Sequence, residues 1–339
     1  MDISLRPLVR TPAKAAPARP SVTPAASPRQ QAYSAAIAAI QKKIDAEKAL
    51  PLQKGEQTVL MAHATPPAKG TIVMYHGYSA GPWQFQQLAQ KAYDDGYNVY
   101  IPRLPGHGLK NAKGAEDPSG LVKSEDYDAY GRFADSTFQD AKALGGPVSV
   151  MGLSVGGEIA LAVAERHPEV QKVVAYAPFM RPKSFGWVMD IVHALDVITF
   201  HQAGKLLDLI PFTWGKESQK QTAEGIDNPQ GRAGHSIFHV GNLYAAEEFG
   251  REVVANAGKI KAPVQFFTSG ADDAADMGAI KQVYNGSGGA SKNGFYEYPT
   301  PEGVPHAMVS PREDNGKGQT PQLYAMTMGF LDAGHEQNR

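Results

Sequence analysis

The sequence predicts an α/β fold, in which a mostly parallel sheet carries helices on both faces. Short runs of β-branched and aromatic residues alternate with longer segments of helical periodicity, which is the pattern of successive β-α-β units. One of these runs, Val148–Met151, passes directly into the pentapeptide 152–156, which has the pattern Gly-x-Ser-x-Gly. This motif at a strand-to-helix turn is typical of a serine nucleophile presented at the end of a sheet strand.

The expected strands and helices follow one another in a regular order. Strands are expected at Gln57–Ala64, Thr71–His76, Asn98–Arg103, Val148–Met151, Lys172–Ala177, Val264–Ser269 and Gly294–Tyr298. Helices are expected from Tyr33 until Pro51 ends the pattern, near Trp83–Asp95 and Ser124–Leu144, at Val155–Arg166, after Met277 and at Gln322–Leu331.

The alternation is interrupted between Arg181 and Gly258. This stretch has no convincing strand but many clustered apolar and aromatic residues, which indicates a helical cap inserted into the core. Met1–Gln31 is rich in Ala, Pro and Ser, and its repeated prolines favour a disordered arm. The expected organisation is an arm at 1–32, the first part of the core at 33–180, the cap at 181–258 and the rest of the core at 259–339.

Composition excludes several classes of function. The net charge of −1 provides no field that would recruit nucleic acid. The absence of cysteine excludes disulfides, cysteine nucleophiles and thiolate metal sites, and no pair of histidines with carboxylate partners falls at the helical spacing of metal ligands. The chain has no apolar run long enough to span a bilayer and no secretory apolar segment, so we expect a cytoplasmic protein without a transmembrane segment.

A second Gly-x-Ser-x-Gly pentapeptide, at 77–81, makes Ser79 a rival to Ser154 as the nucleophile. Both serines have the flanking glycines that a sharp turn requires, so the pentapeptide alone does not decide between them, but the helix after Ser154 starts at once. After Ser79, Pro82 suits the first position of a helix, so the loop is longer before its helix begins. We therefore expect Ser154 to be the nucleophile.

A serine nucleophile needs a histidine base and a carboxylate that orients it, and in this type of fold both follow the serine on loops after later strands. His306 is the only histidine between the last expected strand and the last helix. Three aspartates crowd the loop after Gly270. Asp273 is preferred because it stands three residues after that glycine, with Asp272 and Asp276 as alternatives.

The oxyanion of an acyl-transfer reaction needs backbone donors. Gly77 allows a sharp turn at the end of its strand, so the expected donors are the N–H groups of Tyr78 and of Val155, the residue after the nucleophile. His76 is expected to be structural. His107 is expected to lie near the site without a chemical role.

These segments together resemble α/β-hydrolases of the monoacylglycerol lipase and carboxylesterase type, which are grouped with serine aminopeptidase-like (S33) hydrolases. The resemblance extends from about Gln57 to the end of the chain. It rests on His76–Tyr78, Arg103–Gly108, Gly152–Gly157, Gly270 with Asp273, and His306. It implies an eight-stranded, mostly parallel core, a cap between the sixth and seventh strands, no cofactor and no metal, and it supports Tyr78 and Val155 as the oxyanion hole.

The expected activity is the hydrolysis of a small-molecule carboxylic ester through an acyl-enzyme on Ser154. The apolar cap residues indicate an apolar acyl or aryl group in the pocket, unless they form the cap's own core. An acyltransferase or an aminopeptidase with the same triad is an alternative, as is a binding protein on a hydrolase scaffold. An aminopeptidase would need cap carboxylates to bind the substrate ammonium, and the candidates are Glu217, Glu224, Asp227, Glu247 and Glu248.

Overall fold

The computed structural model describes residues 27–67, 69–199, 202–213, 220–222, 225–227, 234–313 and 316–333. Its α-helices are α1 (Pro28–Glu47), α2 (Gln86–Asp94), α3 (Ala129–Ala143), α4 (Val155–Arg166), α5 (Gly186–Ile198), α6 (Gln202–Leu207), α7 (Val240–Asn256), α8 (Met277–Gly286) and α9 (Thr320–Asp332). Its strands are β1 (Val59–Met61), β2 (Thr71–Tyr75), β3 (Asn98–Ile101), β4 (Val148–Leu153), β5 (Val173–Tyr176), β6 (Pro211–Thr213), β7 (Lys220–Thr222), β8 (Gly225–Asp227), β9 (Ile237–His239), β10 (Val264–Ser269) and β11 (Gly294–Tyr298).

The main sheet has the strand order β1-β3-β2-β4-β5-β10-β11. Strand β1 is antiparallel to β3, and the other neighbouring strands run parallel. The α/β fold with a mostly parallel sheet is therefore confirmed. The expectation of eight strands is wrong for the described residues, which form a seven-stranded sheet. The seven strands are those that the sequence pattern predicted, and the eighth came only from the resemblance; the cap accordingly follows the fifth strand of the main sheet and not the sixth.

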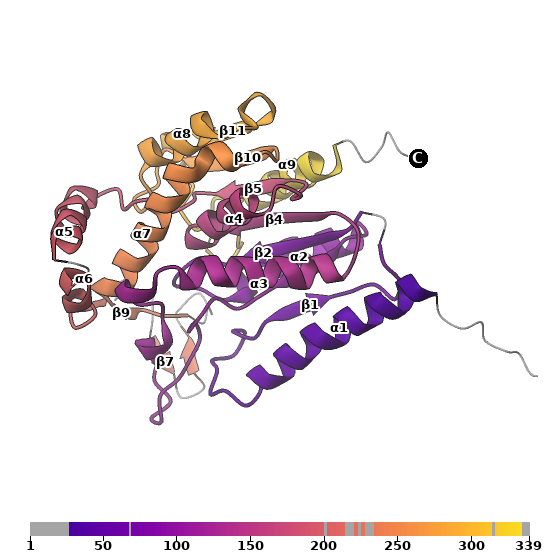
Figure 1. Ribbon diagram of the computed structural model, residues 1–339, viewed down its shortest axis with the longest axis horizontal. Helices are drawn as coiled ribbons and strands as arrows, with labels where there is room; N and C mark the ends of the chain where they lie inside the picture. Colours follow the sequence, from indigo (N-terminus) through magenta and orange to yellow (C-terminus); the bar gives the residue numbers. More distant parts are fainter. Residues whose placement is uncertain are drawn as a thin grey trace, which may run out of the picture.

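The two faces of the sheet carry separate apolar cores. On β2, Ile72 and Met74 pack in the cluster that includes residues of α2 and α9, whereas Val73 and Tyr75 pack in the cluster that includes α3, α4 and α7. Successive side chains of a strand point to opposite faces, so a strand buried on both faces is apolar throughout. Figure 1 shows α1 beside β1, and α5 and α6 at the far end of the molecule from α1.

Helix α1 begins earlier than expected. The Ser27 side chain caps it by accepting a hydrogen bond from the N–H of Gln30, and Pro28 occupies its first turn. Residues 28–32, expected in the arm, are therefore helical. The rest of the predicted arm, residues 1–26, lies outside the described residues.

The cap contains strands as well as helices. Antiparallel pairs β6–β9 and β7–β8 form two small sheets, which corrects the expectation of a purely helical insertion. Strands of three residues are too short for a two-residue alternation to be visible in the sequence. The cap's last helix, α7, packs against α4 of the core.

Helix α5 contacts the protein through polar side chains and Met189, and most of its other large apolar side chains face solvent. Arg251 donates a hydrogen bond to Asp190 at 2.7 Å, and His193 Nδ1 lies 2.7 Å from Glu248 Oε1, so polar side chains join α5 to α7. The exposed apolar side chains of α5 include those of Trp187, Ile191, Leu195 and Ile198, and Ile198 is 72% exposed. These four side chains form neither a core nor the wall of a pocket, whereas Met189 of the same helix is buried and the cap residues Phe238 and Leu243 line the cavity described below. No helix in the described ranges is long and apolar enough to cross a membrane.

Candidate active site

Ser154 lies between β4 and α4, on a turn whose backbone is strained. Its φ of 57° and ψ of −123° are unusual for a residue with a side chain. A Cβ on Gly152 would lie 2.0 Å from the Gly156 carbonyl oxygen, and one on Gly156 would lie 2.1 Å from the Tyr75 carbonyl oxygen. The two glycines of the motif are thus required by the close approach of β2, β4 and α4, as the sequence predicted.

Backbone hydrogen bonds hold the turn at Ser154 against the neighbouring strand. The Ser154 N–H donates to the Tyr176 carbonyl at 2.9 Å. The Ser154 carbonyl accepts from the N–H groups of Gly157 at 2.8 Å and Phe179 at 3.1 Å. The serine is therefore fixed by β5 and by the start of its own helix.

The structure separates the three aspartates of the loop after β10. Asp272 Oδ2 lies 2.7 Å from His306 Nδ1, so Asp272 is the partner of the histidine and the prediction of Asp273 is wrong on this point. Asp276 accepts a hydrogen bond from Ala279 N–H at 2.8 Å and caps α8. Asp273 lines the cavity instead.

The reason for the one-residue difference is the tight turn that Asp272 itself forms. Its Oδ1 accepts hydrogen bonds from the N–H groups of Ala274 at 2.8 Å and Ala275 at 3.1 Å, which directs Oδ2 toward His306. Burial disfavours the charged form of Asp272, but His306 and these donors outweigh burial and lower its pKa below 3.8. Asp272 is therefore a carboxylate at neutral pH.

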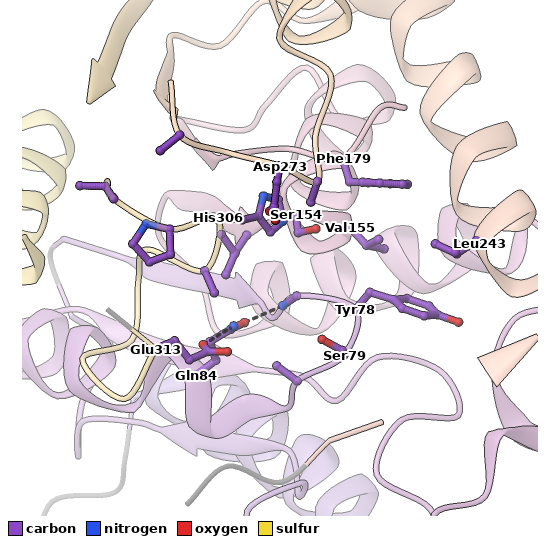
Figure 2. A pocket seen from close by; sticks show the side chains of 18 of the residues that line it. Tyr78, Ser79, Gln84, Ser154, Val155, Phe179, Leu243, Asp273, His306 and Glu313 are labelled. Atoms are coloured by element: carbon purple, nitrogen blue, oxygen red, sulfur yellow. Dashed lines mark hydrogen bonds between the residues drawn. The ribbon is translucent and has the colours of Figure 1, made fainter. Parts of the chain in front are cut away.

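His306 is held in the tautomer that a general base needs. Because the Asp272 carboxylate only accepts hydrogen bonds, His306 Nδ1 carries the proton and Nε2 is available to a nucleophile. Burial disfavours the imidazolium, but the charges of Asp272, Asp273 and Glu313 favour it more strongly, so the pKa of His306 is raised above 6.5. Ser154 and His306 line the same cavity (Figure 2).

The turn after β2 brings a second backbone donor to this cavity. The Ala80 N–H donates to the Gly77 carbonyl at 3.2 Å, which closes a turn over residues 77–80 and does not use the Tyr78 N–H. Val155 is the first residue of α4, so its N–H has no acceptor within the helix. Tyr78 and Val155 both line the cavity with Ser154, the arrangement expected of an oxyanion hole.

Two buried histidines fix the turn. His76 Nε2 accepts from the Leu104 N–H at 3.0 Å, so its Nδ1 donates to the Gly77 carbonyl at 2.9 Å. His107 Nε2 lies 2.6 Å from the Tyr78 carbonyl oxygen. Burial lowers the pKa of both rings, that of His107 to about 4, so both are neutral. Both histidines act on the backbone of the turn, which the sequence did not indicate for His107.

The cavity has a volume of about 490 Å³. Part of its wall is apolar and aromatic, contributed by Tyr78, Phe179, Phe238 and Leu243, of which Phe238 and Leu243 come from the cap strand β9 and from α7. Ser79 also lines the cavity, on the turn that carries Tyr78.

Gln84, Asp273 and Glu313 add polar groups to the wall (Figure 2). Neither Gln84 nor Glu313 could be found from the sequence, because neither belongs to a motif and they come together only in the fold.

Comparison with known proteins agrees with this architecture. The family model described as "Serine aminopeptidase, S33" matches residues 66–300. A thermostable monoacylglycerol lipase of Bacillus sp. (strain H-257) is 28% identical over 103 residues, which are 30% of this chain and only 38% of that protein.

Two solved structures show the same fold at low sequence identity. The Paleococcus ferrophilus monoacylglycerol lipase has a TM-score of 0.58 and 18% identity, over 81% of this chain and 98% of its own. The monoglyceride lipase of Saccharomyces cerevisiae has a TM-score of 0.58 and 16% identity, over 84% and 96%. With a family model matched over more than half its length, the chain belongs to the serine aminopeptidase S33 family of α/β-hydrolases.

Proposed function

We propose that this protein hydrolyses carboxylic esters through an acyl-enzyme on Ser154. His306 takes the proton of the serine hydroxyl as Ser154 attacks the ester carbonyl, and Asp272 stabilises the imidazolium. The N–H groups of Tyr78 and Val155 bind the oxyanion. His306 then protonates the leaving alcohol and activates the water that releases the acid. The observation that carries the proposal is the hydrogen bond between Asp272 and His306 beside the strained Ser154.

The apolar wall supports an ester with an apolar acyl group. Phe179 and Leu243 lie on the side of Tyr78 and Val155 in Figure 2, and Phe238 lines the same cavity. Burial of each methylene against such a wall contributes about 0.8 kcal/mol, so each added methylene should improve kcat/KM until the wall is filled.

The test is a series of p-nitrophenyl esters of graded acyl length. We expect kcat/KM to rise from acetate to a medium chain and then to fall as the cavity of about 490 Å³ is exceeded. A steady decline from acetate upward would contradict the apolar acyl site. The Ser154→Ala variant should be inactive on every ester, and activity in that variant would contradict the mechanism itself.

An aminopeptidase is a second candidate, because the cavity is lined by carboxylates that the triad does not use. These are Asp273 and Glu313, which could bind a substrate ammonium. The cap carboxylates suggested by sequence support it less: Glu247 is bonded to Arg251 at 2.6 Å and Glu248 to His193 at 2.7 Å. Glu217 and Glu224 lie outside the described residues, and nothing is described of the side chain of Asp227.

The same enzyme preparation distinguishes these activities. Hydrolysis of amino-acid arylamides faster than of matched amino-acid esters would favour the aminopeptidase. Ester turnover without arylamide turnover would favour the esterase. Transfer of the acyl group to an added alcohol in preference to water would identify an acyltransferase, and the partition between the two products measures it.

A further inference from the structure

Two side chains without a step in the proposed mechanism connect the histidine loop to the oxyanion turn. Gln84 Oε1 accepts a hydrogen bond from the Gly77 N–H at 2.7 Å. The Gln84 Nε2 group donates to Glu313 Oε2, also at 2.7 Å (Figure 2). Gln84 is 3% exposed and Glu313 is 5% exposed, so water competes little with either bond.

Glu313 determines which way the Gln84 amide points. A carboxylate offers acceptors only, so the NH₂ group of Gln84 must face Glu313 and its carbonyl oxygen is left for the Gly77 N–H. With the amide reversed, the oxygen of Gln84 would face the carboxylate and its NH₂ group would face an N–H donor. Both contacts would then be repulsive.

The bond to Gln84 completes the anchoring of Gly77. The carbonyl of this glycine accepts from His76 Nδ1 at 2.9 Å and from the Ala80 N–H at 3.2 Å, and its N–H is held by Gln84. The Gly77 carbonyl and the Tyr78 N–H belong to one planar peptide unit. Fixing Gly77 at both ends therefore fixes the direction of the Tyr78 N–H.

We propose that Gln84 and Glu313 are positioning residues that hold the Tyr78 N–H in the direction required to bind the oxyanion. The inference rests on the proposed function, in which the Tyr78 N–H is an oxyanion donor. Gln84 follows β2 in the helical turn Pro82–Phe85, whereas Glu313 lies on the loop after His306. The relay formed by Gln84 and Glu313 thus couples the placement of the base to the placement of the donor.

The charge of Glu313 adds to this coupling. Glu313 is among the groups whose charge favours the imidazolium of His306. It therefore acts on both halves of the site: on His306 through its charge and on Tyr78 through Gln84 and Gly77.

The experiment exchanges the two side chains. In Gln84→Glu two carboxylates meet, so we expect kcat to fall roughly 10- to 100-fold with little change in KM, as for a small misplacement of a catalytic group. In the double variant Gln84→Glu/Glu313→Gln, the carboxylate at position 84 accepts from the Gly77 N–H and the amide at position 313 donates to it. We expect the exchange to restore most of the lost kcat.

A matched control exists in α2. Gln90 Nε2 donates to Asp94 Oδ1 at 2.8 Å on the exposed surface, so Gln90→Glu also brings two carboxylates together, at residues that do not line the cavity. We expect kcat to be unchanged in this variant. If Gln84→Glu does not fold, Gln84→Met removes the acceptor of the Gly77 N–H without adding charge, and the same loss of kcat is expected.

Two outcomes overturn the relay. One is a kcat in Gln84→Glu or Gln84→Met equal to that of the wild type. The other is a double variant no more active than Gln84→Glu although it unfolds at the wild-type temperature. Labelling of Ser154 by a fluorophosphonate separates these results from failure of the proposed function. A wild-type protein that neither reacts with the probe nor hydrolyses esters contradicts the esterase, whereas a reactive, active wild type with no rescue contradicts the relay alone.

Discussion

Glu56 packs against Gly81, next to the turn that carries Tyr78, and its buried carboxyl group provides a quantitative test of the structure there. Its side chain is fully buried, and its carboxylate oxygens lie 2.3 Å from the position that a Cβ on Gly81 would take. Burial raises the pKa of Glu56 from 4.5 to about 8, against the opposing effects of Trp83 and Arg103. Glu56 is therefore mostly protonated in the folded protein at neutral pH.

The sign of the effect on stability follows from the raised pKa. Below pH 4.5 the carboxyl is protonated in both the folded and the unfolded chain, and Glu56 costs nothing through ionisation. As the pH rises toward 8, the unfolded chain gains stability by ionising while the folded chain stays protonated. At about 1.36 kcal/mol for each pKa unit, the cost is about 1.4 kcal/mol at pH 5.5 and about 3.9 kcal/mol at pH 7.5.

The Glu56→Gln variant removes this ionisation and keeps nearly the same shape. We expect the free energy of unfolding in urea to rise relative to the wild type by about 2.5 kcal/mol more at pH 7.5 than at pH 5.5. Glu125→Gln, at an exposed position, is the surface control. The assignment of a buried, protonated Glu56 would be refuted if the free energies of unfolding of Glu56→Gln and the wild type differed by the same amount at both pH values.

Other consequences concern the site directly. Asp272→Asn should lower kcat by on the order of 10³- to 10⁴-fold because His306 loses the partner that sets its tautomer, whereas Asp273→Asn should stay within several-fold of the wild type on neutral esters. The kcat/KM of the wild type should fall as the pH is lowered, with a midpoint above pH 6.5, because protonation of the base His306 removes activity and its pKa is raised. Asp273→Asn removes one of the charges that raise this pKa and should move the midpoint to lower pH. Gly156→Ala should abolish activity and lower the melting temperature, because its Cβ would lie 2.1 Å from the Tyr75 carbonyl oxygen.

Each of these predictions has a result that contradicts it. Equal losses in Asp272→Asn and Asp273→Asn would mean that the histidine changes its partner during catalysis. A midpoint that moves upward in Asp273→Asn would reverse the electrostatic argument. Gly329→Ala is the control for Gly156→Ala, because a Cβ at Gly329 in α9 meets nothing within 4 Å. Similar destabilisation in both variants would remove the steric explanation.

The strand, the nucleophile turn and the helix after it could be predicted because their signals are local. A run of β-branched residues, the serine between two glycines and a helical run all fall within about twenty residues of sequence. The structure accordingly has α4 at Val155–Arg166, as expected. β10 and β11 were likewise predicted at Val264–Ser269 and Gly294–Tyr298.

The choice between Asp272 and Asp273 could not be made from the pattern. Adjacent residues in a loop point in different directions, and only the hydrogen bonds from Ala274 and Ala275 show which one is directed at His306. The conformation of such a loop depends on hydrogen bonds that leave no periodic pattern in the sequence.

The cap was the least predictable region. Its apolar residues suggested burial, but helix α5 uses its polar side chains to join α7 and leaves Trp187 65% exposed. Gln84 and Glu313 are separated by 229 residues in the sequence, so only the fold brings them into contact.

The most direct test of the proposed triad is to locate the covalent adduct of a fluorophosphonate by peptide mapping. We expect one adduct, on Ser154, which is retained in Ser79→Ala and lost in Ser154→Ala. We also expect Asp272→Asn to react far more slowly than the wild type, with ester hydrolysis falling in parallel. An adduct on Ser79, or an adduct on Ser154 that forms at the wild-type rate in Asp272→Asn, would contradict the proposed triad.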